Sequence, residues 1–383
     1  MLLAEDMIRN FGGVWNSSPA IAGLPITEPA NQWICGFSFN SAQISQGETS
    51  HFPKTFDETS GNDDQFTTRK RKRKRLSSLD HFRGLALFLM ILVNSLSPYN
   101  VPKWLKHSPW NGYQFPDLVA PLFLFAMGVA YRISLQRRLS RFGIKKTLFH
   151  FIKRYVILFL FGFLGILLVK RSFDWGILQM LGAVGLFILP IMFLSPLCSI
   201  ITSFILLIFY QISMNVFGLS DFILKFDMGG PFSTLSWAFI PVFAASFVGV
   251  EVFSQKNHTY LKKFLLVGIM LSLAGFAESY FIPFNKHLVS SSYILFSTGL
   301  ATILFSVFYI LVEICKFHID IFNALGKNSL VIFMFTNIIS TILSVNIPKS
   351  LPIIYPILAT IGLLVISIII AKIFMRYEIY IKL

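Results

Sequence analysis

The stretch Ile361-Gly-Leu-Leu-Val-Ile-Ser-Ile-Ile-Ile370 lies inside a longer apolar run, residues 352–375. As a helix, such a run is long enough to cross about 30 Å of hydrocarbon. Similar runs recur along the 383-residue chain, which is 55% hydrophobic and contains 42 Phe. Only 13% of the residues are charged, whereas about a quarter are charged in a soluble domain. The sequence therefore predicts an all-α polytopic membrane protein.

The apolar runs predict a bundle of about ten transmembrane helices. Only Ser195-Pro196 separates the fourth run from the fifth. The ten expected spans are residues 78–97, 117–136, 149–169, 176–194, 197–216, 234–253, 263–282, 290–313, 326–345 and 352–375.

The segment before the first span differs in kind from the rest. Residues 1–68 are rich in Ser, Asn, Gly, Thr and Pro and lack a signal-peptide pattern. We expect a disordered polar tail there, or translated sequence upstream of the true start. Residues 69–75 form a polybasic juxtamembrane run, and residues 76–383 form the expected transmembrane domain.

The net charge of +15 has two explanations. A basic run can bind nucleic acid, but next to a span it sets topology and attracts anionic lipid. Most Lys and Arg between the spans fall on one side, which we therefore expect to be cytoplasmic. We therefore expect both termini inside the cell and the loop that contains His107 outside it. We also expect the plasma membrane as the location and no nucleic-acid partner.

One polar loop between the first two spans carries a titratable group, in Lys106-His-Ser-Pro-Trp-Asn-Gly112. His107 exchanges protons near neutral pH, because its free pKa is about 6.5. A loop histidine without a function is the alternative. Asp117 follows ten residues later, where its carboxylate can cap the next helix or hold the imidazole in one tautomer.

The first span carries a polar stripe. Asn94 follows Arg83 by eleven positions, about three helical turns, so the two side chains lie on nearly the same face of the helix, about 16 Å apart along its axis. Asp80 lies one step from that face and can pair with Arg83. Polar groups in spans usually face a cavity or a partner, although an interfacial pair and a packing Asn would look the same.

Several other polar or small residues interrupt the apolar runs. Gly128 permits close helix packing or the approach of a cofactor. Gln179 puts an amide in the fourth apolar run. The segment Ile282-Pro-Phe-Asn-Lys-His-Leu288 forms a second loop on the same expected side of the membrane as the His107 loop. Gly326-Lys-Asn-Ser329 opens the ninth span. Taken singly, each is a weak signal, since polar residues in membrane helices often bond to other helices.

Taken in order, these segments resemble the heparan-alpha-glucosaminide N-acetyltransferase family over about residues 76–345. The similar segments are Leu79-Asp-His-Phe-Arg-Gly84, the Met90–Asn94 end of the first span, Lys106-His-Ser-Pro-Trp-Asn-Gly112, Asp117-Leu-Val-Ala-Pro-Leu-Phe-Leu-Phe125, Ile177-Leu-Gln-Met-Leu-Gly182, Ile282-Pro-Phe-Asn-Lys286 and Leu325-Gly-Lys-Asn-Ser329.

The resemblance implies transfer of an acetyl group from cytosolic acetyl-CoA, as co-substrate, to a glucosamine amine across the membrane. It makes His107 the active-site histidine and Asn94 its close partner, and we add Asp117 as the residue that orients the ring. The residues that we assign to acetyl-CoA are Asp80, Arg83, Gly128, Gln179, Asn328 and Ser329. Those that we assign to the amino-sugar or glycan acceptor are Trp110, Asn111, Asn285 and Lys286.

The chemistry leaves alternatives open. A neutral imidazole can remove the proton of the attacking amine, or it can accept the acetyl group itself. An O-acetyltransferase, or a transporter for a glycan or lipid-linked sugar, would also suit a polar membrane interior, although transporters usually show internal repeats. The three cysteines suggest no metal site, and a homodimer is left open.

Overall fold

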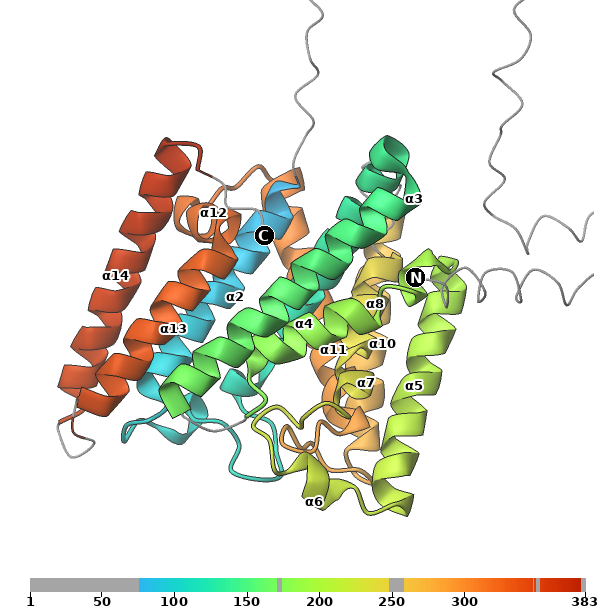
Figure 1. The fold of residues 1–383 in the computed structure, drawn as a ribbon, viewed down its shortest axis with the longest axis horizontal. Helices are drawn as coiled ribbons and strands as arrows, with labels where there is room; N and C mark the ends of the chain where they lie inside the picture. Colours follow the sequence, from blue (N-terminus) through green and yellow to red (C-terminus); the bar gives the residue numbers. More distant parts are fainter. Residues whose placement is uncertain (1–75, 171–173, 248–257, 347, 349–351, 380–383) are drawn as a thin grey trace, which may run out of the picture. The chain divides into compact units, whose positions relative to one another are not determined.

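The computed structural model describes residues 76–170, 174–247, 258–346, 348 and 352–379. These residues form helices and no strand (Figure 1). Within them, six helices are long and apolar enough to cross a membrane, and a bent helix pair makes a seventh. The prediction of an all-α polytopic membrane protein is therefore confirmed. The expected tail and polybasic run lie outside the described residues.

The helices differ greatly in length. The long ones are α2 (Ser77–Leu96), α3 (Val119–Lys170), α5 (Pro196–Val216), α10 (His258–Glu278), α11 (Ser291–Tyr309), α13 (Ser329–Asn346) and α14 (Ile354–Arg376). The shorter ones are α4 (Ile177–Phe187), α6 (Ser220–Ile223), α7 (Thr234–Trp237), α8 (Phe239–Phe247) and α12 (Asp320–Lys327). The 3₁₀ turns are η1 (Lys103–Leu105), η2 (Phe115–Leu118) and η3 (Ile191–Phe193), and the π-helical turn η4 (Ile310–Ile314) continues α11.

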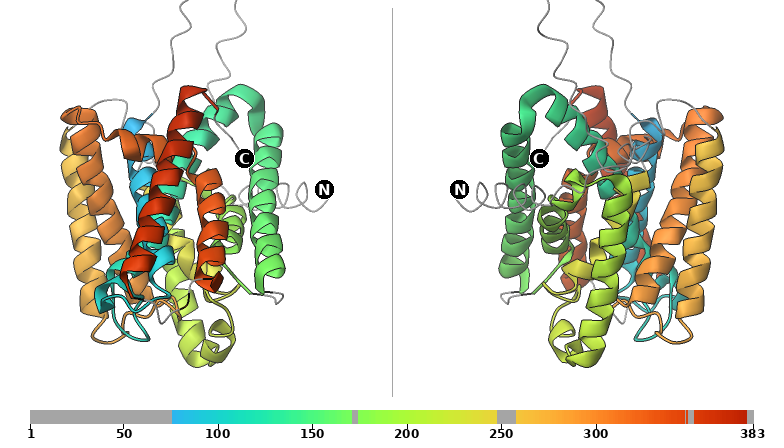
Figure 2. Two further views of the ribbon diagram at one scale, coloured as in Figure 1. Left: turned by 90° about the vertical axis from the view of Figure 1, so that its left-hand side faces the viewer. Right: turned by 90° about the vertical axis from the view of Figure 1, so that its right-hand side faces the viewer.

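Helix α3 contains two of the expected spans. The segment between them, residues 137–148, contains three Arg, two Lys and two Leu, which are good helix formers, and it is helical on either side of Gly143. The helix breaks at Gly143, whose φ of 70° and ψ of 179° are not helical, and the chain reverses direction there (Figure 2). We call the two parts α3a (119–142) and α3b (144–170).

The count of ten spans is not confirmed. Helix α4 has 11 residues and is only about 16 Å long, roughly half of a bilayer core. The α7–α8 segment, Thr234–Phe247, is also a short apolar helix, and Trp237 in it is fully buried. Hydropathy could not separate these segments from spans, because a short buried helix is as apolar as a lipid-facing one. The expected ninth span is an α12–α13 pair bent by 89°.

Glycines allow the helices to approach each other closely. A Cβ on Gly326 of α12 would lie 1.7 Å from the backbone oxygen of Asp80 in α2. A Cβ on Gly128 of α3a would lie 2.2 Å from the backbone oxygen of Pro241 in α8. Neither distance is compatible with a side chain, so Gly128 has the helix-packing role that the sequence offered as one of two alternatives.

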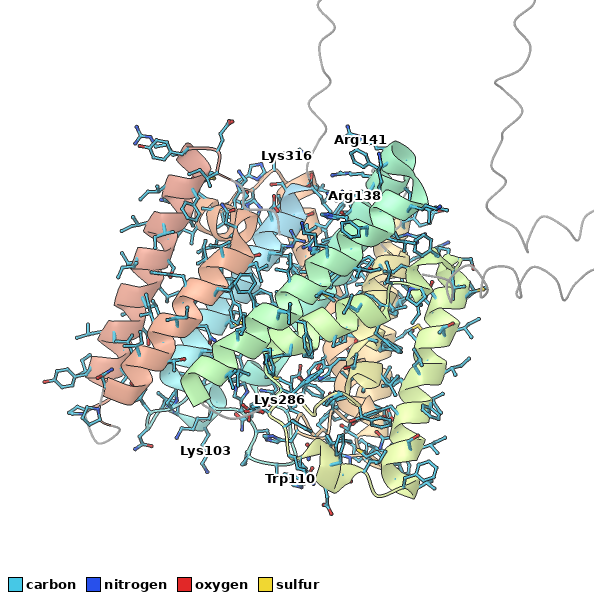
Figure 3. The ribbon with its side chains drawn as sticks, in the orientation of Figure 1. Lys103, Trp110, Arg138, Arg141, Lys286 and Lys316 are labelled. Atoms are coloured by element: carbon cyan, nitrogen blue, oxygen red, sulfur yellow. The ribbon has the colours of Figure 1, made fainter. Side chains whose placement is uncertain are left out.

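The helices place charged residues at two opposite ends. Arg138, Arg141 and Lys316 lie at one end, and Lys103 and Lys286 lie at the other (Figure 3). We call these the basic end and the His107 end, since the loop containing His107 joins η1 to η2. The two loops that the sequence expected on one side of the membrane are thus on one side of the bundle.

Candidate active site

Two loops meet at the His107 end, residues 106–114 and residues 282–290. The backbone N–H of Gly112 donates a hydrogen bond to the backbone oxygen of Phe284 over 2.8 Å. Each loop follows a helix that ends at this end of the bundle, and the contact joins segments that are far apart in the sequence.

Side chains reinforce this contact. The amide of Asn285 donates to Oδ1 of Asn111 over 3.1 Å and accepts from the backbone N–H of Leu288 over 2.8 Å. The rings of Trp110 and His287 are stacked with centroids 6.1 Å apart. Asn285 is buried, so the structure gives it a role in holding the loops together. Substrate contacts of these residues remain predictions.

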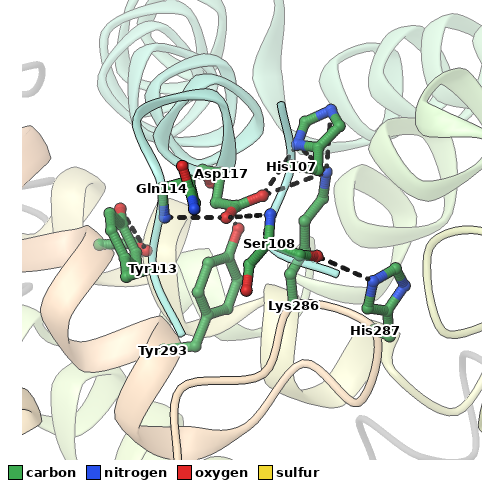
Figure 4. A network of polar contacts seen from close by, with 9 residues as sticks. His107, Ser108, Tyr113, Gln114, Asp117, Lys286, His287 and Tyr293 are labelled. Atoms are coloured by element: carbon green, nitrogen blue, oxygen red, sulfur yellow. Dashed lines mark hydrogen bonds and ion pairs between the residues drawn. The ribbon is translucent and has the colours of Figure 1, made fainter. Parts of the chain in front are cut away.

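Asp117, in the turn η2, contacts the His107 loop (Figure 4). Its Oδ1 lies 2.8 Å from Nδ1 of His107. Its Oδ2 accepts the backbone N–H groups of Ser108, over 3.2 Å, and of Gln114, over 3.0 Å. The last contact belongs to a capping box at η2. Asp117 is therefore not the N-cap that the sequence offered as one alternative; it is the third residue of η2, where it completes the capping box with Gln114, and it also contacts the imidazole.

Lys286 reaches the same ring from the second loop (Figure 4). Its Nζ lies 2.9 Å from Nδ1 and 3.4 Å from Nε2 of His107, and 3.7 Å from Oδ1 of Asp117. The Lys286 side chain is only 11% exposed. A buried cation needs a nearby anion, and Asp117 provides one. The sequence placed Lys286 among acceptor ligands but did not indicate this contact.

These neighbours set the protonation of His107. A carboxylate only accepts hydrogen bonds, so the Asp117 contact favours the tautomer with hydrogen on Nδ1 and leaves the lone pair on Nε2. Burial lowers the pKa of His107 below 6.5; the hydrogen bond with Asp117 opposes this effect, and the charge of Lys286 adds to it. Burial also lowers the pKa of Lys286 to about 8. His107 is therefore mostly a neutral base at pH 7.

His107 faces a cavity of about 380 Å³. We call it the His107 cavity. Its walls also contain three other residues predicted from the sequence or in contact with His107: Asn94 of α2, Gln179 of α4 and Lys286. The remaining lining comes mainly from apolar residues of α2, α3a, α3b, α4 and α13. Four predicted site residues thus share one cavity, and Asp117 lies behind His107.

Sequence reasoning missed three polar residues in the cavity wall: Asp227, Asn337 and Thr341. Asn337 and Thr341 are four residues apart and so lie on one face of α13. That spacing within an apolar run was a usable signal. Asp227 lies in the loop between α6 and α7, where nothing in its spacing indicated a site.

The other residues assigned to acetyl-CoA do not line this cavity. Asp80 and Arg83 lie in the first two turns of α2, and the cavity reaches along α2 only to Met90. Asn328 and Ser329 lie at the bend between α12 and α13. Because Gly326 packs on the Asp80 backbone, two of the predicted segments meet at the start of α2.

Comparisons with known proteins bear on this site. Heparan-alpha-glucosaminide N-acetyltransferase of Mus musculus is 44% identical over 81 residues, which are 21% of this chain and 12% of the mouse protein. The Homo sapiens protein of the same name is 46% identical over 74 residues, 18% of this chain and 11% of that protein.

The resemblance to these acetyltransferases is confirmed. The matched segments nevertheless cover only a small part of either relative.

Two further matches cover more of the chain. A family described as "Domain of unknown function (DUF5009)" matches residues 75–195, which include His107, Asp117 and Asn94. A Bacillus acidopullulyticus protein described as "Uncharacterized 39.9 kDa protein in amylase 3'region" is 31% identical over 145 residues, 36% of this chain and 40% of that protein.

Proposed function

We propose that the protein is a membrane-bound acetyltransferase that uses acetyl-CoA and acetylates the amine of an amino sugar. The observation that carries the proposal is the 2.8 Å contact between His107 and Asp117 at the wall of a cavity that Asn94 also lines. The similarity to heparan-alpha-glucosaminide N-acetyltransferases supports the reaction class.

In the direct route, Nε2 of His107 takes a proton from the amine as its nitrogen attacks the thioester carbonyl carbon. The carbon–sulfur bond then breaks, and His107 returns the proton to the departing sulfur. Asn94 donates a hydrogen bond to the carbonyl oxygen as negative charge develops there. Asp117 holds the ring and stabilises the imidazolium that forms.

In the covalent route, Nε2 of His107 attacks the thioester carbonyl carbon, and the carbon–sulfur bond breaks to release the CoA thiolate. The amine then attacks the acetyl carbon, the bond between this carbon and the ring nitrogen breaks, and the proton lost by the amine passes to the thiolate. Both routes need a neutral ring, and in both the substrate takes the place of Lys286 at Nε2, which lies 3.4 Å from Nζ of that lysine. Brief exposure to labelled acetyl-CoA without acceptor distinguishes them, because only the covalent route leaves label on His107.

The basic end is suited to the phosphates of CoA, because guanidinium groups bind phosphate in a bidentate manner. We therefore propose that this end, together with both termini, is cytoplasmic. The cavity reaches Met90, about 10 Å along α2 from Arg83. The thioester arm would cover that distance along the Asp80–Asn94 stripe.

The test is acetyl transfer by the full chain in proteoliposomes. Labelled acetyl-CoA is added to one face and an amino sugar to the other, and the product is analysed. We expect N-acetylated sugar, formed only when acetyl-CoA is at the basic end. An O-acetyl product would contradict the amine acceptor, and sugar transport without thioester cleavage would contradict the enzyme.

The pH dependence of kcat/KM provides a second prediction. Substitutions of two neighbours of His107, Asp117 and Lys286, should shift the acidic limb of this profile in opposite directions. The acidic limb of the kcat/KM profile follows the pKa of His107, because only the neutral ring acts as a base. Asp117 raises this pKa and Lys286 lowers it. Asp117→Asn should therefore move the limb to lower pH, and Lys286→Gln should move it to higher pH.

Lys103→Gln is the matched control, since Lys103 is an exposed lysine at the same end. Solvent and salt screen its charge, so the limb should stay where it is in the unaltered protein. Shifts of the same sign in Asp117→Asn and Lys286→Gln would contradict the assignment of the limb to His107.

A further inference from the structure

The His107 cavity reaches the lipid-facing surface of the bundle. Part of its wall comes from Phe161 and Gly165 of α3b and from Asn337 and Ile338 of α13. These residues are exposed, with relative accessibilities of 44% for Phe161 and 58% for Ile338. The two helices lie side by side on one face of the bundle (Figures 1 and 2). The cavity therefore opens sideways between them.

The opening lies about halfway along α13. Asn337 is the ninth residue of α13, which has 18, so it is about 12 Å from the first residue of that helix. Hydrocarbon surrounds a membrane helix at this depth. The side opening therefore connects the cavity with acyl chains, whereas Lys286 and Asp227 line it at the His107 end.

Two amides in the cavity wall call for a polar occupant. Within the described part of the chain, the side chains of Asn94 and Asn337 make no hydrogen bond. An amide without a partner is unfavourable in an apolar surrounding, and polar side chains in spans usually face a cavity or partner. Asn337 is at the side opening, so a polar group must pass or rest there.

The cavity size limits what fits inside. About 380 Å³ is near the lower end of small-molecule sites, roughly 300–1,000 Å³. This space holds a sugar ring next to an acetyl group, but not a long attached chain as well. A hydrocarbon chain attached to the sugar fits the apolar opening beside Phe161 and Ile338.

We propose that the acceptor is a lipid-anchored amino sugar whose headgroup reaches His107 from the bilayer, between α3b and α13. This rests on the proposed function for the acetyl transfer, but not for the lipid entry. The hydrocarbon chain stays in the opening, and Asn337 binds the headgroup as it enters.

The first experiment compares two acceptors in proteoliposomes, dodecyl glucosaminide and methyl glucosaminide. Gly165→Phe places a ring in the opening, and it is compatible with the fold because a Cβ at Gly165 meets no atom within 4 Å. Gly362→Phe on α14 is the matched control, since a Cβ there also meets none.

We expect Gly165→Phe to lower the ratio of kcat/KM for the dodecyl over the methyl acceptor by about tenfold, the effect of displacing roughly two methylene groups. Gly362→Phe should leave this ratio unchanged. Partitioning of the dodecyl chain into the bilayer cannot produce this difference, because it is the same for all variants. An unchanged ratio in Gly165→Phe would overturn the proposal.

The second experiment does not need the reaction. A dodecyl glucosaminide with a photoreactive group in its chain should label α3b and α13 more strongly than dodecanol with the same group, and Gly165→Phe should abolish the excess. Labelling without any acetyl transfer would support lipid entry and contradict the proposed function. Acetylation of both acceptors without excess labelling would overturn lipid entry and leave the proposed function intact.

Discussion

Replacing His107 with Ala is expected to lower kcat by about 10²- to 10⁴-fold, the contribution of a positioned acid–base group. The variant loses the imidazole whose Nδ1 contacts Asp117 and whose Nε2, 3.4 Å from Nζ of Lys286, is the nitrogen that we assign to the substrate. If His107 carries the acetyl group in a covalent route, the loss is at least as large.

The same substitution should leave the fold intact. His107 lies in a loop, and its side chain is 33% exposed. Asp117 keeps its two backbone hydrogen bonds and the nearby Lys286, so no buried carboxylate is left without a partner. The measurement is single-turnover transfer of labelled acetyl, together with the thermal unfolding temperature of the purified variant.

His287→Gln is the matched control, because it alters a second imidazole at the same end that is not part of the cavity wall. We expect it to keep most of the activity. Near-normal turnover in His107→Ala would contradict the central assignment, and equal losses in the two variants would indicate damage to the loop contact instead.

The sequence predicted part of this site because some of its geometry is local. Asp117 follows His107 by ten residues, which is close enough for a turn to bring them together. Asn94 could be placed by helical phase relative to Arg83, since α2 is a regular helix. Lys286 is 179 residues from His107, and no local pattern indicates that it contacts the ring.

The errors in the fold have a related cause. The α4 and α7–α8 segments were expected as spans because their residues are apolar, but their length is set by packing inside the bundle. Asn337 was missed because the sequence around it is mostly apolar. It is a single amide in an apolar run, and only the position of α13 beside the cavity shows that Asn337 lines the site.

Replacing Asn94 with Ala should lower kcat by about 10²- to 10³-fold, the usual effect of removing one donor to a developing oxyanion. Asn94 lines the His107 cavity and, within the described residues, its side-chain amide makes no hydrogen bond. It is therefore free to donate to the thioester oxygen. Asn94→Asp should be as slow as Asn94→Ala, because an ionised carboxylate cannot donate.

The loss should be the same at every pH, because Asn94 is not among the groups that shift the pKa of His107. This separates Asn94→Ala from Asp117→Asn, whose acidic limb moves. Met90→Leu, which alters the cavity wall one turn away on α2 without removing a donor, should keep most of the activity. If Asn94→Ala raises KM and leaves kcat unchanged, the amide stabilises the ground state and the transition state equally, and the oxyanion role is wrong.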